Sequence, residues 1–276
     1  RAPGVLPDLG FDVGRFFRGA GRDDQKQRQQ RCLPADEQPA PIAPAGTPPS
    51  RHRDLRDFRI AGWFDDAHCP VDAATSAALA HLASLIDGAG GAVNTDARPG
   101  FTLERADRIF ERLLQAALSG GHSLDQIERM AADDSEGTIG AVRRATAARH
   151  REWLADNERR LQLRERWAEF FRDFDAILLP VQPRAAIPHD HSEPQWGRRV
   201  EIGGVERDYL DLFRWTGPAG AGMLPATVVP IGRDDDGLPI GVQIVGPYLE
   251  DKTTLALAAH IAELCGGCPR PALAQR

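Results

Sequence analysis

The sequence predicts an α/β fold, and two observations carry that prediction. First, segments 174–180, 226–232 and 238–246 ("FDAILLP", "ATVVPIG" and "LPIGVQIVG") are nearly continuous apolar runs, which is the pattern of strands covered on both faces. Second, amphipathic segments with apolar residues at helical spacing lie before and after them. The 276 residues suffice for one large domain or two small ones, and 42% of them are apolar, enough for a core.

The folded part is expected to open with a strand, a helix and a second strand. The β-rich run Phe58–Phe64 predicts the first strand. A helix follows, with Pro70 and Asp72 at its start and the glycines of 88–91 at its end. Residues 92–95 ("AVNT") then predict a short second strand.

Three further helices are expected. One opens with the capping pattern of Thr102 and closes at Gly120. Residues 140–174 contain no internal proline or glycine and predict one long helix with an aromatic face. The last helix is expected to be capped by Asp251, after a hairpin whose turn uses Gly237 at positive φ. The predicted buried face of the long helix comprises Val142, Ala145, Trp153, Leu163, Trp167, Phe170, Phe171 and Phe174.

The two ends of the chain differ from the rest. Residues 1–50 combine a polar run, "RDDQKQRQQR", with the proline-rich "PADEQPAPIAPAGTPPS", so we predict a disordered segment or linker there and a folded domain over 51–276. Near the other end, "CGGC" (265–268) suggests a redox or zinc site, but no second ligand pair has suitable spacing. We interpret it as a glycine-terminated helix end with two free thiols.

Composition argues against several functional classes. The net charge of −6 does not favour binding to nucleic acid or to an anionic membrane. No apolar run approaches the length of a membrane span. The low cysteine content fits a reducing compartment, which predicts a cytoplasmic protein.

Several motifs together resemble the C-terminal half of amidase signature enzymes. These are "DLRDFRIAGW" (54–63), the helix "VDAATSAALAHLASLIDGAGGAV" (71–93), "DLFRW" (211–215) and above all "GLPIGVQIVGP" (237–247). The resemblance extends from Leu55 to Leu264. It implies an α/β fold with a mixed β-sheet flanked by helices on both faces, of which this chain carries the C-terminal, incomplete part.

The resemblance also implies a chemistry whose residues this chain lacks. Enzymes of the family hydrolyse carboxylic amides with a serine nucleophile, a second serine in a cis peptide and a lysine base. No two serines here are adjacent: they are Ser50, Ser76, Ser84, Ser119, Ser123, Ser135 and Ser192. Lys26 lies in a charged run and Lys252 starts the last helix, so neither is expected to be buried and neutral. We therefore predict no catalytic residue and no activity for the chain alone.

The residues that resemble the family predict one wall of a substrate-binding cleft. Tyr209, Trp215 and the loop with His189 and Asp190 are candidates for it, although Trp215 suits the core better, because large aromatic side chains are mostly packing residues. The small-residue segment ending at Gly222 is expected to pass close to the cleft. Two imidazoles and one carboxylate on the "PHDH" loop are only a partial metal-ligand set, so no metal or cofactor is expected.

Three functions remain open at this point. The chain is the C-terminal part of an amidase, which would act on a small amide once an amidase-type N-terminal polypeptide completes it. Alternatively, it is a non-catalytic module that binds an amide or a partner, or it is one component of an amidotransferase-like complex. Strand edges left open by an incomplete sheet predict self-association.

Overall fold

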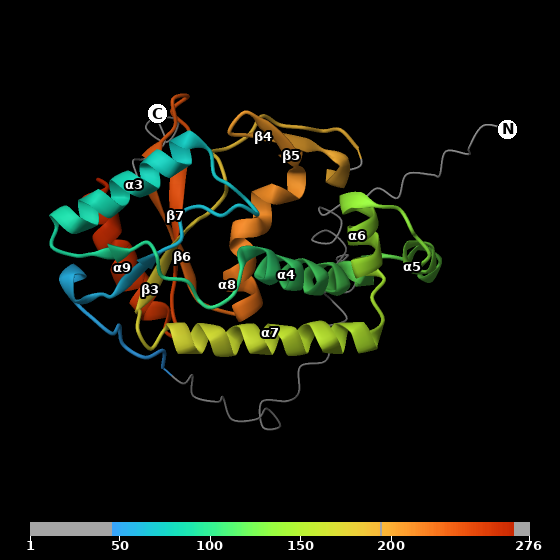
Figure 1. Ribbon diagram of the computed structural model, residues 1–276, viewed down its shortest axis with the longest axis horizontal. Coiled ribbons are helices and arrows are strands. Elements are labelled where there is room, and N and C mark those ends of the chain that lie inside the picture. The colour runs from blue at the N-terminus through green and yellow to red at the C-terminus, as the bar shows by residue number, and fades with distance from the viewer. Residues whose placement is uncertain (1–45, 194, 268–276) are drawn as a thin grey trace, which may run out of the picture.

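The computed structural model describes residues 46–193 and 195–267, and it contains a mixed β-sheet (Figure 1). Its strand order is β2-β1-β3-β7-β6. Strand β1 runs parallel to both of its neighbours, whereas β7 is antiparallel to β3 and β6. The prediction of a mixed α/β sheet is thus confirmed. The bounds are β1 Ile60–Gly62, β2 Val93–Asn94, β3 Ala176–Pro180, β6 Ala226–Arg233 and β7 Pro239–Val245.

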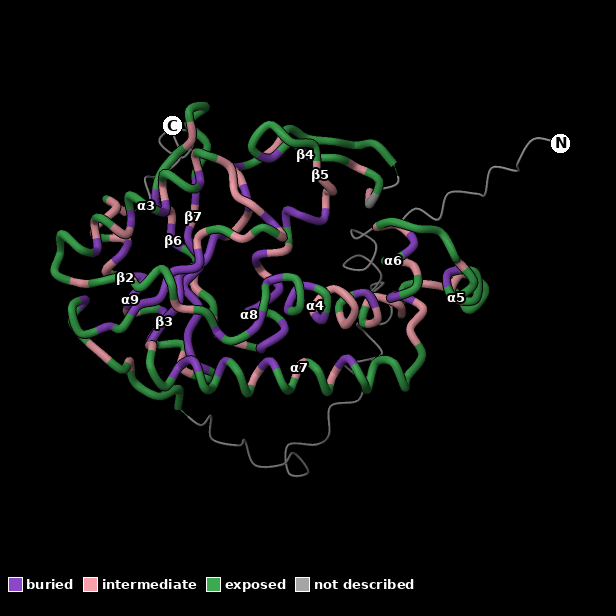
Figure 2. Tube along the Cα trace, viewed as in Figure 1, coloured by how far each residue is buried: buried purple, intermediate pink, exposed green. Residues whose placement is uncertain are grey.

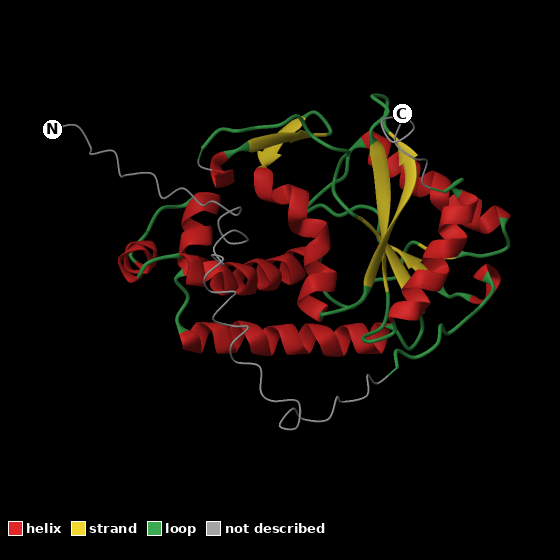
Figure 3. Cartoon of the chain, turned by 180° about the vertical axis from the view of Figure 1, so that it is seen from behind, coloured by secondary structure: helices red, strands yellow, loops and turns green. Residues whose placement is uncertain are grey.

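Helices cover both faces of this sheet (Figure 3). Helices α3 (Ala73–Gly88) and α9 (Asp251–Leu264) pack on one face, and α4 (Leu103–Leu118), α7 (His150–Phe170) and α8 (Gly217–Gly222) pack on the other. Strand β3 joins the two cores, because Leu178 points into the first and Ile177 into the second. All of β3 is buried, as predicted, and Figure 2 shows the buried residues concentrated along the central strands.

The remaining elements of the described chain are short helices, a small hairpin and 3-10 helices. Two short helices, α5 (Leu124–Ala131) and α6 (Gly137–Thr146), follow α4 in the chain, and a small hairpin of β4 (Arg199–Ile202) and β5 (Val205–Asp208) stands apart from the main sheet. The 3-10 helices are η1 (Leu55–Asp57), η2 (Ser119–Gly121), η3 (Gln195–Gly197) and η4 (Tyr209–Thr216). None of the helices in the described ranges has the length and hydropathy that a membrane span requires.

Capping side chains begin two of the predicted helices. The carboxylate of Asp72 accepts the backbone N–H of Thr75 at 2.8 Å at the start of α3, and the hydroxyl of Thr102 accepts that of Arg105 at 3.2 Å at the start of α4. The last helix differs from its prediction, since Asp251 is its first residue rather than its cap. Glu250 occupies the cap position and makes no capping hydrogen bond from its side chain.

The prediction of one long helix over 140–174 is wrong. Helix α6 ends at Thr146, and α7 starts at His150. Arg149 is extended (φ −71°, ψ 152°), and its N–H donates to the Glu152 carboxylate at 2.8 Å, which starts a new helix without any proline or glycine. Trp153, predicted to be buried, is instead 37% exposed and stacks on His150.

Strand β6 also departs from the expectation of burial on both faces. It is the edge strand of the sheet, and Val228 is 55% exposed. The edge position explains why Pro230 is tolerated inside it, since its missing N–H is not needed by a second neighbour. The turn to β7 uses Gly237 at φ +80°, as predicted.

The termini bear on two other predictions. The predicted linker over 1–50 lies outside the described residues except for 46–50, which form neither helix nor strand. Helix α9 is followed by Gly266 and Gly267 at φ +79° and +76°, which agrees with a glycine-terminated end. Cys265 is free, and Cys268 lies outside the described residues.

A buried carboxylate ties the segment before β1 to the start of β3. The side chain of Asp175 is fully buried and contacts Arg59 at 2.7 Å, Arg51 at 3.1 Å and His52 at 3.1 Å. It also accepts the backbone N–H of Arg59 at 2.9 Å. Burial alone raises the pKa of Asp175, but the hydrogen bonds from Arg59 and Arg51 outweigh it and hold that pKa well below its ordinary value.

This carboxylate predicts an acid-sensitive stability. Because its folded pKa lies below the unfolded value of about 3.9, the unfolded chain binds more protons at low pH. The stabilisation is complete above about pH 5 and is lost progressively as the pH falls towards the folded pKa, with a total magnitude of about 2 kcal/mol. Urea unfolding between pH 3 and pH 7 measures it. Asp175→Asn should lower stability at pH 7 and flatten this acid limb, whereas equal pH dependence in both proteins would contradict the prediction.

Candidate functional site

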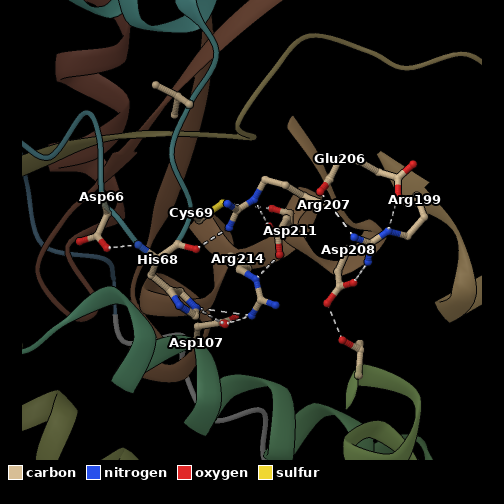
Figure 4. A network of polar contacts seen from close by, with 12 residues as sticks. Asp66, His68, Cys69, Asp107, Arg199, Glu206, Arg207, Asp208, Asp211 and Arg214 are labelled. Carbon is tan, nitrogen blue, oxygen red and sulfur yellow. Dashed lines mark hydrogen bonds and ion pairs between the residues drawn. The ribbon is translucent and has the colours of Figure 1, made fainter. Parts of the chain in front are cut away.

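The carboxyl ends of the parallel strands are the expected position of a ligand site. In open α/β sheets, ligands bind outside these ends. The segment after β1 runs from Trp63 to Cys69, and the long loop after β3 leads to the small hairpin and η4. A network of polar contacts connects these segments to α4 (Figure 4).

Arg214 lies at the centre of this network. Its guanidinium contacts the carboxylate of Asp107 on α4 and that of Asp211, one turn earlier on η4, at 2.5 Å. The Asp107 carboxylate also contacts His68 Nε2 at 2.9 Å. Only 16% of the Arg214 side chain is exposed, against 8% for Asp107 and 4% for Asp211. Burial alone lowers the pKa of Arg214, but the two carboxylates raise it above its ordinary value, so the group is permanently charged.

A second arginine extends the network to the loop after β1. Arg207 Nε donates to Asp211 at 2.5 Å, and its terminal nitrogen donates to the carbonyl of His68 at 2.9 Å. The Cys69 thiol donates to the Asp211 carbonyl at 3.4 Å. Burial raises the pKa of Cys69 to about 12, so the group is a protonated thiol at neutral pH and not a nucleophile. The network therefore holds η4 in position, and its thiol does not serve as a nucleophile.

Further polar contacts, centred on Asp208, hold the small hairpin against α6. The Thr138 hydroxyl on α6 donates to Asp208 at 2.5 Å, and Asp208 also pairs with Arg199 across the hairpin. The hairpin and η4 also share a separate apolar cluster around Val200, Ile202 and Leu212. Thus α4, α6, the hairpin and η4 are fixed relative to one another.

The outward face of η4 carries an aromatic pair. Tyr209 and Phe213, four residues apart, meet edge to face with ring centroids 5.8 Å apart. The Arg198 guanidinium lies 5.8 Å from the Tyr209 ring. Phe213 is 41% exposed and so offers an apolar surface beside the network. The sequence interpretation names Tyr209 but misses Phe213, although the aromatic i, i+4 spacing within "YLDLF" is a signal that could have found it.

Trp215 faces the opposite way. Its side chain is fully buried, its ring meets Trp63 edge to face at 5.9 Å, and its Nε1 donates to the Cys69 carbonyl at 3.0 Å. Trp215 is therefore a core residue whose N–H donor is satisfied, and it does not form part of a cleft wall.

Gly222 ends α8 where that helix packs closely on its neighbours. A methyl group at this position would lie 2.9 Å from Leu224 Cγ and 3.0 Å from Trp167 Cδ1. At Gly220 the corresponding distance to Phe110 is 2.5 Å. The small residues of α8 therefore permit its close approach to α4 and α7, which is a packing role.

His189 and Asp190 lie on the exposed loop after β3. Asp190 accepts the N–H of Ser192 at 2.8 Å, and this hydrogen bond lowers the pKa of Asp190. The rings of His189 and His191 are 6.0 Å apart. Among the described residues, no group of three or more His, Cys, Asp or Glu side chains is arranged to hold a metal ion. The five predicted site residues thus do not converge on one point.

Comparison with known proteins identifies the family. The model of the family described as Amidase matches residues 12–255. The chain belongs to the amidase signature family.

Individual relatives are each similar to part of the chain. A "Putative amidase" of Synechocystis sp. is 35% identical over 104 residues, which cover 37% of this chain and 19% of that protein. A glutamyl-tRNA(Gln) amidotransferase subunit of Leptospira interrogans is 30% identical over 110 residues, 39% of this chain and 20% of that protein.

A solved structure supports the same fold. The "Crystal structure of amidase" superposes with a TM-score of 0.59 at 20% identity, over 80% of this chain and 48% of that one. The chain therefore spans about half of this solved amidase, and the matched regions are about a fifth of each of the two curated relatives.

Proposed function

We propose that this chain provides the substrate-side wall of an amide hydrolase, and that another polypeptide segment provides the catalytic serine pair and lysine. Membership of the amidase signature family supports hydrolysis of a carboxylic amide. The observation that carries the proposal is the exposed Phe213 beside Tyr209, held by the buried Arg214 network at the carboxyl ends of the strands. An apolar wall fixed by buried ion pairs is suited to orienting an apolar substituent of the substrate.

The residues of the chain support the second half of the proposal. Attack on an amide needs an activated nucleophile with a base within hydrogen-bond reach. Two of the described serines serve the local backbone instead: Ser84 donates to the carbonyl of Ala80, and Ser123 caps α5. Lys252 is exposed on α9, which covers the other face of the sheet, and Lys26 lies outside the described residues.

A second candidate function is that of one component in an amidotransferase-like complex. It is favoured by the 30% identity to a glutamyl-tRNA(Gln) amidotransferase subunit over 110 residues. In that case the same wall would face a donor amide, and a partner protein would receive the ammonia. In either function we place the protein in the cytoplasm, on the basis of its low cysteine content.

The purified 276-residue chain tests this proposal. We expect no hydrolysis of a panel of aliphatic and aryl p-nitroanilides, and no covalent labelling by a fluorophosphonate probe, because the sequence holds no adjacent serine pair and Lys252 is exposed. Intact-mass spectrometry measures the labelling. Stoichiometric modification of a single serine in the folded chain, absent after heat denaturation, would overturn the proposal.

A further inference from the structure

One cavity among the described residues lies away from the η4 network. It has a volume of about 870 Å³ and is bounded by one side of α7 and by the loops before β6 and after β7. Leu224 lies two residues before β6, and Tyr248 lies three residues after β7. Because β7 is antiparallel to β3, this is the end of the sheet where β3 begins, opposite to the carboxyl ends of the parallel strands.

The walls of this cavity, which we call the α7 cavity, are mainly apolar. Leu161 and Phe171 of the α7 region face Leu224 and Tyr248 of the two loops. Leu161 is 38% exposed and Tyr248 is 46% exposed, so the apolar surface is open to solvent. A cavity of this size with such walls lies within the range that binds small molecules.

Two strained residues border the α7 cavity. Met223 (φ +53°) and Leu249 (φ +65°) are the non-glycine residues of the described chain with positive φ, and each is adjacent in sequence to a lining residue. Their side chains are 56% and 59% exposed. A left-handed backbone costs free energy for such residues, and strain of this kind clusters at ligand sites. Each of the two strained loops thus exposes an apolar side chain to solvent at the border of the α7 cavity.

Two arginines on the cavity wall have no carboxylate partner among the described residues. The Arg164 guanidinium lies 4.0 Å from the centroid of the Tyr248 ring, and Arg172 engages other described residues only through its backbone. In contrast, Arg51 on the same wall is held by Glu250 at 2.6 Å and by Asp175 at 3.1 Å. Arg164, stacked on a ring, keeps the edge of its guanidinium free for a bidentate carboxylate.

We propose that the α7 cavity is a binding site for a small amphipathic anion, a carboxylate with an apolar body. The apolar body lies against Leu161, Phe171 and Leu224, and Arg164 and Arg172 pair with the carboxylate. The charged residues that line the cavity are one carboxylate, Glu165, and three arginines, Arg51, Arg164 and Arg172, and this balance favours an anion over a cation of the same size. The site is separate from the η4 wall and does not depend on the proposed amide hydrolysis.

Calorimetric titration of the full chain with sodium decanoate, below its micelle concentration, tests this site. We expect saturable binding with one molecule per chain, and no saturable binding of decylammonium, which has the same tail and the opposite charge. Arg164→Gln should weaken decanoate binding at least tenfold. The matched control is Arg166→Gln on the same helix, whose partner is Glu169 at 3.0 Å, and it should change binding less than twofold.

Several outcomes would overturn the proposal. One is the absence of saturable decanoate binding, and another is equal binding of decylammonium. A third is equal weakening in the Arg164 and Arg166 variants at unchanged melting temperature. A dimer in sedimentation that Leu161→Glu dissociates, but decanoate does not, would instead identify the cavity as an interface between two copies of this chain. Arg172→Gln is a second test variant. Because Arg172 is exposed, weaker decanoate binding by this variant cannot be attributed to misfolding.

Discussion

Replacing Arg214 with methionine is expected to lower the free energy of unfolding by about 3–5 kcal/mol. The substitution leaves the carboxylates of Asp107 and Asp211 buried, 8% and 4% exposed, without their shared cation. Methionine fills much of the arginine volume, so the loss reports the weaker compensation of these charges rather than a cavity, because Asp211 keeps only Arg207 and Asp107 keeps only His68. Chemical unfolding followed by tryptophan fluorescence measures it.

Two controls separate this effect from a general loss of positive charge. Arg108→Met removes an i,i+4 pair with Glu104 whose side chains are 70% and 55% exposed, and it should cost less than about 1 kcal/mol. Adding Asp107→Leu to Arg214→Met removes one stranded carboxylate and should restore part of the lost stability. If Arg214→Met costs no more than Arg108→Met, the network does not hold η4 in place, and the support for Phe213 as a fixed wall is lost.

The fold could be predicted where local signals and tertiary packing agree. The apolar run that forms β3 and the caps Asp72 and Thr102 each specify their element within a few residues. The break at Ala147–Arg149 could not be predicted in this way, because a single hydrogen bond from Arg149 to Glu152 creates it in a stretch of good helix formers. The apolar content of β6 likewise does not reveal that β6 is an edge strand, since strand order is set by the whole sheet.

The candidate site is less accessible to sequence reasoning. Asp107 and Arg214 are 107 positions apart, and His68 reaches Asp107 from another segment, so no local pattern indicates that they meet. The sequence offers Tyr209 and Trp215 alike as wall candidates, yet η4 turns Trp215 into the core and leaves Phe213 exposed in its place. Which aromatic of a short 3-10 helix faces outward depends on the cores on either side, not on its own sequence.

Co-expression with an amidase-type N-terminal polypeptide that carries the serine pair and the lysine is expected to raise amide hydrolysis from background to a measurable rate. The physical reason lies in the edges of the sheet. Both faces are covered by helices, but β6 pairs only with β7 among the described strands, and β2 has two residues. An open edge is a template for a further strand. We therefore expect the chain alone to self-associate and the N-terminal polypeptide to occupy an edge in a one-to-one complex.

Substitution at the β6 edge tests this expectation. Val228 is 55% exposed on the edge strand, and a charged side chain there opposes strand addition. Size-exclusion chromatography of Val228→Lys should show less self-association than the unmodified chain and a weaker complex with the N-terminal polypeptide. Leu124→Lys, at an 81% exposed position on α5, is the matched control and should change neither. A monodisperse monomer with a cooperative thermal transition, unchanged by the N-terminal polypeptide, would contradict completion by a second half, and it would favour a module that binds its amide without hydrolysing it.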